Sequence, residues 1–517
     1  MVGSWEIIVV GAGSSGAALA ARSARKGRRV LLLEAGIDYR SAALPEEWRS
    51  PNPMTGLLSP TVGDYLWPEL NATRTAEQEP YLYWRGRGVG GSSTVNGQIA
   101  IRPPMEDFEE WVKAGCTGWG PEEVLPYFAA LEADQDFGSR DYHGTTGPTP
   151  VFRAPVENWG AVDEGLRAAA LQHGFGWAED VNAPGATGVS PYPINSRGGR
   201  RVSTNDAYLE PARNLATLEI RGDSLVDTVV FEGTRAVGVR LAGGEVLRAE
   251  QVVLSAGVVA SPAILLRSGI GPADALTRLG VEVRADLPVG QDMQDHPMSL
   301  IGLPLTPEHS AGPDDRHTNC CVRYDSGRPD LPNDMMLVAL NQNALAMSSA
   351  DVRAGAGAVG VFVNRVFSRG SIEITDLDPA AQPLVRENML SDERDLRRLR
   401  DGVRLLAELV DTDPIRDICD GDLWRVNRPL REALDGTDAH LDRYLRATAV
   451  DTQHGTSTCR MGSADDRTAV VDPSCRVLGV SGLRVIDASI FPFVPRANTN
   501  LTAIMTGEFM ADRLDAS

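Results

Sequence analysis

The sequence contains little cysteine. Six cysteines occur in 517 residues, and no two of them form a C-x-x-C pair. Such sparse cysteine excludes a disulfide-stabilised scaffold and gives no structural zinc pattern. It is typical of a reducing compartment, so we expect a cytoplasmic location, with peripheral membrane association left open.

Basic residues and long apolar runs are also scarce. Lys and Arg number 50 against 70 Asp and Glu, a net charge of −20, which argues against a nucleic-acid partner. The longest uncharged apolar stretches, residues 7–21 and 252–266, fall short of the roughly 18 residues of a membrane helix. We therefore expect no transmembrane segment, and the late first basic residue, Arg22, indicates no secretory leader.

The N-terminus carries a β-α-β pattern. Residues 6–10 and 29–34 are apolar, strand-like runs, and residues 17–25 between them are small and helix-prone. The turn after the first run has the spacing G-x-G-x-x-G, which predicts a dinucleotide site in this context. The alternative is a merely tight strand–helix turn. The candidate phosphate-binding residues are Gly11, Gly13, Ser14, Ser15 and Gly16.

An acidic residue, Glu34, ends the second run and is followed by Ala35. A carboxylate at this position accepts hydrogen bonds from a ribose diol and repels a 2′-phosphate, which disfavours NADP. A second glycine-rich segment, residues 85–97, is interpreted as a tight cradle rather than a flexible linker because its flanks are hydrophobic and aromatic.

Further elements follow from local patterns. We predict strands at 98–101, within 217–241 and at 251–257, and a helix that begins at residues 261–262. Residues 391–411 have the apolar spacing of an amphipathic helix. Two stretches, 307–318 and 348–358, are predicted to be soft.

The C-terminal part gathers polar residues around a histidine. His454 lies in a turn rich in Gly, Thr and Ser, whereas His296 lies in a Q-D-H-P loop that fits a structural role equally well. Residues 483–490 are predicted to form a last strand carrying Asp487. A final helix follows, with Asn498 or Thr499 as its N-cap.

These motifs together resemble the glucose–methanol–choline (GMC) flavin oxidoreductases, with a choline-dehydrogenase-like pattern. The resemblance rests on GAGSSG with Glu34, GGSSTVNG, STNDAYL, SAGVVASPAILLRSGIG, VGQDMQDHP, HGTSTCRMG, GLRVIDASIFP and ANTNLTAIM, in the family's order. It implies an α/β fold with a Rossmann-like FAD-binding domain, formed by residues 1–152, 196–299 and 448–517. Residues 153–195 and 300–447 would form a substrate-binding domain with a mainly antiparallel sheet.

The resemblance also implies roles for individual residues. His454 matches the family's active-site histidine, which takes the alcohol proton, and Asn498 matches the second active-site position. FAD is expected to be bound without a covalent link, because Val95 offers no nucleophile in the loop over the flavin. No metal is expected. The further cofactor-binding candidates are Gly88, Val89, Gly91, Asn96, Gly97, Val226, Asp487, Ala488 and Thr499.

The predicted reaction is oxidation of a primary or secondary alcohol to a carbonyl, with hydride transfer to flavin N5. A quinone or another carrier is the favoured electron acceptor, which makes the protein a dehydrogenase. The alternatives are an oxidase that forms H2O2 from O2, a non-redox lyase on the same scaffold, and a non-catalytic flavin-binding protein. Residues 300–380 give no confident match to the family's pattern, so the resemblance does not identify the alcohol. The sequence does not show the oligomeric state either.

Overall fold

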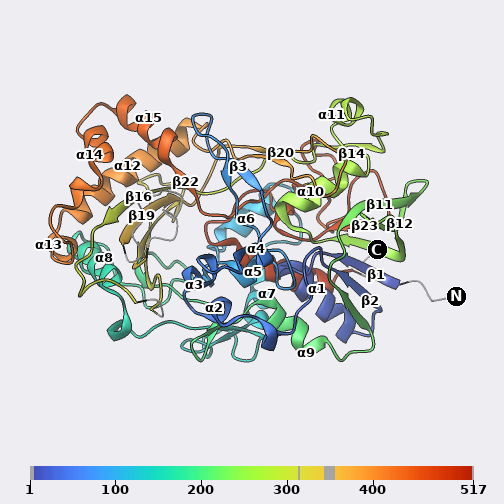
Figure 1. Cartoon of the computed structure of the whole chain (residues 1–517), viewed down its shortest axis with the longest axis horizontal. Coiled ribbons are helices and arrows are strands. Elements are labelled where there is room, and N and C mark those ends of the chain that lie inside the picture. Colours follow the sequence, from blue (N-terminus) through green and yellow to red (C-terminus); the bar gives the residue numbers. More distant parts are fainter. Residues whose placement is uncertain (1–4, 313–314, 343–355, 515–517) are drawn as a thin grey trace.

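The computed structural model describes residues 5–312, 315–342 and 356–514. Most of the second predicted soft stretch and two residues of the first therefore lie outside the described residues. The described chain forms two large sheets that lie on opposite sides of the molecule (Figure 1).

The first sheet contains the predicted β-α-β unit. Strands β1 (Trp5–Val10) and β2 (Val30–Leu33) run parallel, and Ile8 lies between Leu31 and Val252 in register. Continuous apolar runs of this kind suit parallel strands that are covered on both faces. The strand order is β10-β2-β1-β13, and β23 pairs with the end of β13. These further strands are β10 (Leu218–Arg221), β13 (Val246–Leu254) and β23 (Leu483–Val485).

Two long helices meet beside this sheet. Helix α1 (Ser14–Arg25) follows β1, and α16 (Thr499–Ala511) comes from the far end of the chain. The Ser15 hydroxyl donates to the Ala503 carbonyl at 2.7 Å, and a Cβ at Gly507 would lie 2.3 Å from the Ser15 carbonyl oxygen. The two helices therefore pack closely enough to bring both N-termini to one region.

The second sheet is wholly antiparallel, with the order β22-β16-β19-β18-β17-β7. Successive side chains of each strand point to opposite faces of the sheet. Met298, Val338 and Phe362 therefore face the first sheet, whereas Ile301 and Leu337 join the outer core. The bounds are β7 (Gly188–Pro191), β16 (Pro297–Leu303), β17 (Cys320–Tyr324), β18 (Met335–Leu340), β19 (Gly357–Val363) and β22 (Val450–Asp451).

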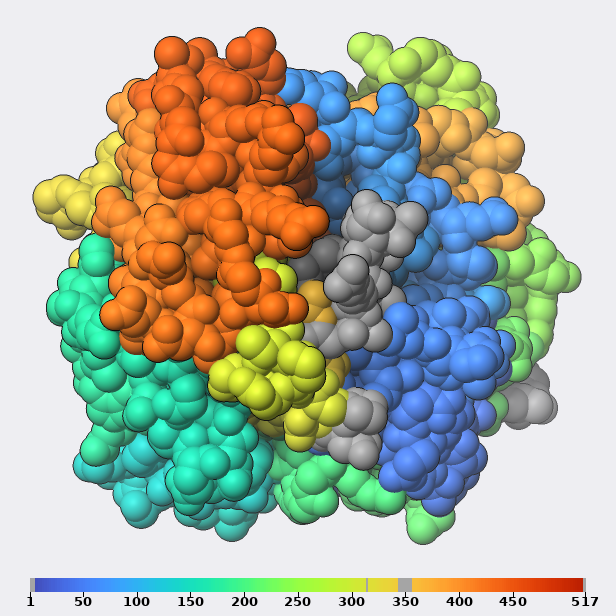
Figure 2. Space-filling view, turned by 60° about the vertical axis from the view of Figure 1, so that its left-hand side comes forward, coloured from blue at the N-terminus to red at the C-terminus, as the bar shows by residue number. Residues whose placement is uncertain are grey.

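Helices cover the outer face of the antiparallel sheet, seen in teal and orange in Figure 1, and the teal and orange segments form much of the surface in Figure 2. The predicted amphipathic helix is α12 (Glu393–Val410), which buries Leu399, Val403 and Leu406 against this sheet, as its spacing predicts. The other covering helices are α8 (Ala161–Gln172), α13 (Asp413–Arg416), α14 (Arg428–Leu434) and α15 (Asp438–Thr448).

Smaller elements complete the fold. An antiparallel hairpin, β11 and β12, extends the first sheet, and a four-stranded sheet joins β3 and β4 to β20 and β21. The strands are β3 (Asn71–Thr73), β4 (Tyr81–Leu82), β5 (Glu132–Asp134), β6 (Thr149–Val151), β8 (Ser196–Arg197), β9 (Arg200–Arg201), β11 (Val226–Glu232), β12 (Arg235–Leu241), β14 (Ile270–Gly271), β15 (Ala285–Asp286), β20 (Ser371–Glu373) and β21 (Leu384–Arg386). The remaining α-helices are α2 (Glu46–Arg49), α3 (Pro53–Leu57), α4 (Val62–Tyr65), α5 (Ser92–Val95), α6 (Glu106–Lys113), α7 (Pro121–Leu131), α9 (Glu210–Ala212), α10 (Gly257–Arg267) and α11 (Ala273–Arg278).

Three local predictions are wrong. Helix α10 begins at Gly257, four residues before the predicted start, so Pro262 lies inside it. The Val258 carbonyl, which would otherwise accept from residue 262, accepts from the Thr458 hydroxyl at 2.7 Å instead. Residues 98–101 form only an isolated bridge, because Gln98 has φ +63°. The last strand ends at Val485, after which the Asp487 carboxylate caps a 3₁₀ turn.

The predicted fold class, a Rossmann-like α/β part with a mainly antiparallel second sheet, is confirmed. The predicted domain boundaries stay a prediction. Strands β16 and β22 of the antiparallel sheet lie at two of those boundaries, and both contain residues that were assigned to the cofactor part. Among the described residues, no helix combines the length and apolar character needed to cross a bilayer.

Candidate active site

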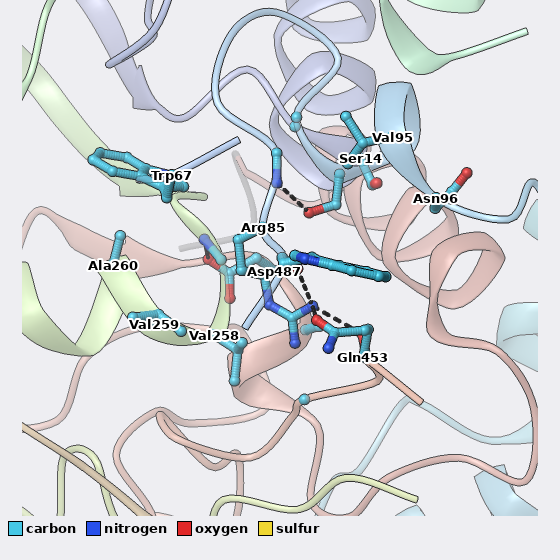
Figure 3. A pocket seen from close by; sticks show the side chains of 18 of the residues that line it. Ser14, Trp67, Arg85, Val95, Asn96, Val258, Val259, Ala260, Gln453 and Asp487 are labelled. Carbon is cyan, nitrogen blue, oxygen red and sulfur yellow. Dashed lines mark hydrogen bonds between the residues drawn. The ribbon is translucent and has the colours of Figure 1, made fainter. Parts of the chain in front are cut away.

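A cavity of about 400 Å³ lies between the two large sheets. Such a volume is within the range of small-molecule and cofactor sites. The glycine turn after β1, the end of β2 and the N-terminus of α16 line it, and the inner face of the antiparallel sheet supplies Met298, Val338 and Phe362. Figure 3 shows Ser14, Val95 and Asn96 on one side of it and Val258 and Val259 on another.

Two glycine-rich loops meet at this cavity. Gly11 has φ +100°, and a Cβ there would lie 2.5 Å from the Ser255 carbonyl oxygen. Gly91 has φ +50°, and its Cβ would lie 2.7 Å from the Cα of Gly13. Side chains at these positions would overlap the backbone of the neighbouring segments, which explains the glycines physically.

The N-termini of α1 and α16, which lie at the cavity, have no side-chain cap. Gly13 and Asn498 are the N-cap residues of α1 and α16, and neither helix start receives a side-chain hydrogen bond. Free N–H groups and the positive end of the helix dipole favour an anion such as a diphosphate. Asn498 is thus at the predicted cap position, but its amide points to His454 instead.

Glu34 is buried and accepts three backbone hydrogen bonds. Its Oε2 accepts from Ala12 N at 2.9 Å, and its Oε1 accepts from Gly36 N and Gly88 N at 3.0 Å each. Burial raises the pKa of Glu34, and the three N–H donors and Arg87 oppose that rise. The carboxylate therefore ties the two glycine loops together, besides lining the cavity.

Most predicted cofactor-binding residues line the cavity. Gly16, Gly88 and Val89 do not: Gly16 packs against the Gly11 carbonyl, Gly88 donates to Glu34, and the Val89 carbonyl accepts from Tyr39. The lining candidates are Gly11, Gly13, Ser14, Ser15, Glu34, Ala35, Gly91, Asn96, Gly97, Val226, Asp487, Ala488 and Thr499.

His454 and Asn498 are in direct contact at the cavity wall. The Asn498 Nδ2 group donates to His454 Nε2 at 2.9 Å, and the Tyr192 hydroxyl donates to Asn498 Oδ1 at 2.7 Å. Burial, together with His296 and Arg85, lowers the pKa of His454 well below its usual value. The imidazole is therefore neutral at neutral pH and can accept a proton.

Several residues at the site carried no usable sequence signal. Tyr192 contacts Asn498 from 306 residues away, and Asp295 holds the backbone N–H of His454 across 159 residues. Arg85 donates to the Gln453 carbonyl at 3.0 Å, a contact drawn in Figure 3. Only Thr452, two residues before His454, could have been suspected from its position.

Within the part of the chain that the structure describes, two buried groups of acidic and histidine side chains could hold a metal by distance alone. One contains Glu132, Asp134 and His143, and the other contains Asp295, Glu387 and Asp451. Arginines already pair with members of both groups, as the Arg102–Glu132 and Arg74–Asp451 contacts illustrate. The absence of a metal stays a prediction.

The chain belongs to the GMC oxidoreductase family. Sequence models of this family match residues 5–298 and 366–507, which carry the glycine turn, Glu34, His454 and Asn498. Members of this family bind FAD and act on CH–OH donors, so the protein is an FAD-type oxidoreductase acting on alcohols.

Particular relatives are similar over nearly the full length. The chain is 37% identical to a 5-(hydroxymethyl)furfural oxidase of Methylovorus sp. (strain MP688), covering 99% of this chain and 98% of that protein. It is 33% identical to an oxygen-dependent choline dehydrogenase of Sinorhizobium medicae (strain WSM419), covering 98% and 95%. The crystal structure of a pyridoxine 4-oxidase from "Mesorbium loti" superposes with a TM-score of 0.88 at 26% identity, covering 99% of this chain and 100% of that one.

Proposed function

We propose that this protein oxidises uncharged alcohols to carbonyl compounds, with His454 as the proton acceptor. The observation that carries the proposal is the His454–Asn498 contact at a cavity that also receives both glycine loops and two uncapped helix N-termini. When bound, FAD supplies the hydride-accepting ring.

The residues present fit FAD. The N-termini of α1 and α16 would hold its diphosphate, Glu34 its ribose hydroxyls, and the segment around Val226 its adenine. We propose non-covalent binding, since Val95 has no nucleophile and the six buried cysteines are absent from the lining residues.

The proton transfer follows from the hydrogen bonds at His454. Its Nε2 atom accepts from Asn498 in the structure, so Nε2 carries a lone pair at the cavity wall. A substrate hydroxyl that approaches Asn498 can give its proton to this nitrogen. Tyr192 fixes the Asn498 amide, which keeps the geometry constant between substrates.

The cavity wall favours a substrate without positive charge. Met298, Val338 and Phe362 form an apolar surface, and the only carboxylates among the described lining residues are Glu34 and Asp487. Both accept backbone N–H bonds, so neither is a free partner for an ammonium group. We therefore expect hydroxymethyl groups on uncharged rings to be better substrates than choline.

A separate part of the proposal concerns the electron acceptor. Sequence analysis favours a quinone or another carrier, whereas the similar proteins include two named as oxidases and one named as oxygen-dependent. These names lead us to propose O2 as the acceptor, with H2O2 as the product.

An anaerobic flavin-reduction screen tests the function. Benzyl alcohol and 2-hydroxymethylfuran should bleach the bound flavin, and choline should do so much more slowly. Air should then restore the flavin and form one H2O2 per flavin. Failure of every alcohol to bleach the flavin contradicts the function, and faster reoxidation by a quinone than by air contradicts the acceptor.

A further inference from the structure

A buried group of three acids lies directly behind His454. Asp295, Glu387 and Asp451 are each 1% exposed, and their carboxylate oxygens lie within 4.8 Å of one another. Asp295 is the member that faces the active site, because its Oδ1 accepts from the backbone N–H groups of His454 and His296 at 2.9 and 2.7 Å.

A hydroxyl group connects this acid to the imidazole. The Thr452 hydroxyl lies 2.7 Å from His454 Nδ1 and 3.2 Å from Asp295 Oδ1. Thr452 has one hydroxyl hydrogen, and an ionised Asp295 can only accept it. The hydroxyl oxygen that faces His454 is then an acceptor, so Nδ1 carries the ring hydrogen. The same nitrogen lies 2.9 Å from His296 Nδ1, which is then the unprotonated nitrogen of the His296 ring. His454 Nε2, which faces Asn498, is left unprotonated.

We propose that Asp295, acting through Thr452, is the positioning residue that holds His454 in the Nδ1–H tautomer and stabilises its protonated form during turnover. This inference rests on the proposed role of His454 as the proton acceptor. The hydrogen bonds then run in one direction, from Tyr192 through Asn498, His454 and Thr452 to the carboxylate of Asp295. When Nε2 takes the substrate proton, the negative charge at the end of this chain stabilises the imidazolium.

The surroundings of Asp295 allow it to be ionised. Tyr83 donates to its Oδ2 at 3.1 Å and itself accepts from Arg85, while Arg74 pairs with Asp451 at 2.6 Å. The positive charges of Arg85 and Arg74 thus offset the negative charges of Asp295 and Asp451.

The third acid, Glu387, has no hydrogen-bond partner for either oxygen, which fits a neutral carboxylic acid. Burial, followed by Asp451 and Asp295, raises the pKa of Glu387 well above its usual value. Burial and the charge of Asp451 raise the pKa of Asp295 to about 6, so Asp295 is ionised above that pH. His296, the remaining titratable neighbour, has a pKa lowered to about 4 by burial and is neutral.

Four variants separate this role from simple packing. Thr452→Val removes the linking hydroxyl at nearly constant volume, and Thr452→Ser restores it. Asp295→Asn removes the charge while an amide oxygen can still accept hydrogen bonds. Glu387→Gln is the matched control, since it changes a buried acid of the same group that lies outside the hydrogen-bonded chain.

The first readout is the ring ¹⁵N spectrum of His454 in the holoenzyme without substrate, which requires no catalysis. We expect Nδ1 protonated and Nε2 unprotonated in the wild type, in Thr452→Ser and in Glu387→Gln, and a mixture of tautomers in Thr452→Val. A wild-type spectrum with Nε2 protonated, or an unchanged tautomer in Thr452→Val, overturns the proposal. This holds even if no alcohol reduces the flavin, so the two proposals can fail separately.

The second readout is the pH profile of anaerobic flavin reduction. Loss of a partner that orients a functional histidine typically costs about 10- to 100-fold, and we expect this slowing in Thr452→Val and Asp295→Asn, with recovery in Thr452→Ser. The wild-type rate should rise with pH near 6, and Asp295→Asn should lack this step. Equal loss in Glu387→Gln, or an unchanged pH step in Asp295→Asn, contradicts the role of Asp295.

Discussion

At the scale of single residues, Glu34 combines a predicted contact with a ribose and an observed contact with three backbone N–H groups. The β-α-β pattern predicts an acid that meets a ribose, but the three N–H groups that bind this carboxylate come from three segments, and the farthest, Gly88, is 54 residues from Glu34. The contact with Gly88 depends on tertiary structure, so only the contact with the ribose could be predicted from local spacing.

Replacing Glu34 by Gln tests the contact with the backbone N–H groups. The amide would turn an N–H donor toward Ala12, Gly36 or Gly88, which leaves a buried donor unpaired at a cost of about 1–3 kcal/mol. We expect FAD affinity to fall by about 10- to 100-fold, measured by fluorescence titration of the apoprotein. Glu219→Gln, an exposed change on β10 of the same sheet, is the control. Unchanged affinity in Glu34→Gln would contradict this account.

At the scale of elements, periodic patterns predicted the helices and strands whose formation depends on local sequence. The alternation of apolar and charged residues placed α12 almost to the residue, and the first β-α-β unit was found in the same way. The start of α10 was missed because Pro262 is a strong helix-start signal. Its position inside the helix depends on a hydroxyl 200 residues away in sequence.

That hydroxyl provides a test of element packing. Thr458→Val leaves the buried Val258 carbonyl without its side-chain donor, and an unpaired buried acceptor costs about 1–3 kcal/mol. We expect this loss in the free energy of unfolding, measured by urea denaturation of the holoenzyme. Thr448→Val is the control, because Thr448 makes a similar bond to the Tyr444 carbonyl on an exposed helix face. Equal losses in the free energy of unfolding in both variants would mean that the Thr458 hydroxyl does not stabilise the Val258 carbonyl.

At the scale of the whole molecule, the candidate active site is formed only when distant segments meet. Tyr192 and Asp295 reach the His454–Asn498 pair, and Arg85 reaches the neighbouring Gln453, from three separate parts of the chain. Motif matching found the pair because each member lies in its own short pattern. It could not find the neighbours, since no local spacing reports a contact across more than a hundred residues.

A buried group of charged residues around His143 predicts how the free energy of unfolding depends on pH. His143 lies between Glu132, Asp134 and Asp180, with Arg102 and Arg153 beside them. Burial alone would lower the pKa of His143, but the hydrogen bonds to Asp180 and Glu132 outweigh it and raise the pKa. A raised folded-state pKa stabilises the fold at low pH, and this stabilisation is lost as the pH rises through it.

The stability difference between the wild type and His143→Gln should therefore shrink as the pH rises from 6 to 9. Thermal unfolding of both proteins across this range measures it. His440→Gln, a change at an exposed histidine, should show no such trend. A difference that is constant with pH would mean that the pKa of His143 is not raised in the folded state.

The retention of FAD is also a property of the whole molecule. In the proposed non-covalent mode, with no nucleophile at Val95, loop N–H groups, two helix N-termini and burial of the rings would hold the cofactor. Acid or heat denaturation should release all of the flavin into the supernatant. A flavin-mass adduct on any peptide would contradict non-covalent binding.

The most direct test of the central claim is the rate of anaerobic flavin reduction in His454→Ala, measured by stopped flow with a saturating uncharged alcohol. Loss of a general base typically slows the reaction by about 10²–10⁴-fold, and we predict a loss of this size with normal FAD content. The same reduction rate in His454→Ala and the wild type would show that His454 does not take the substrate proton.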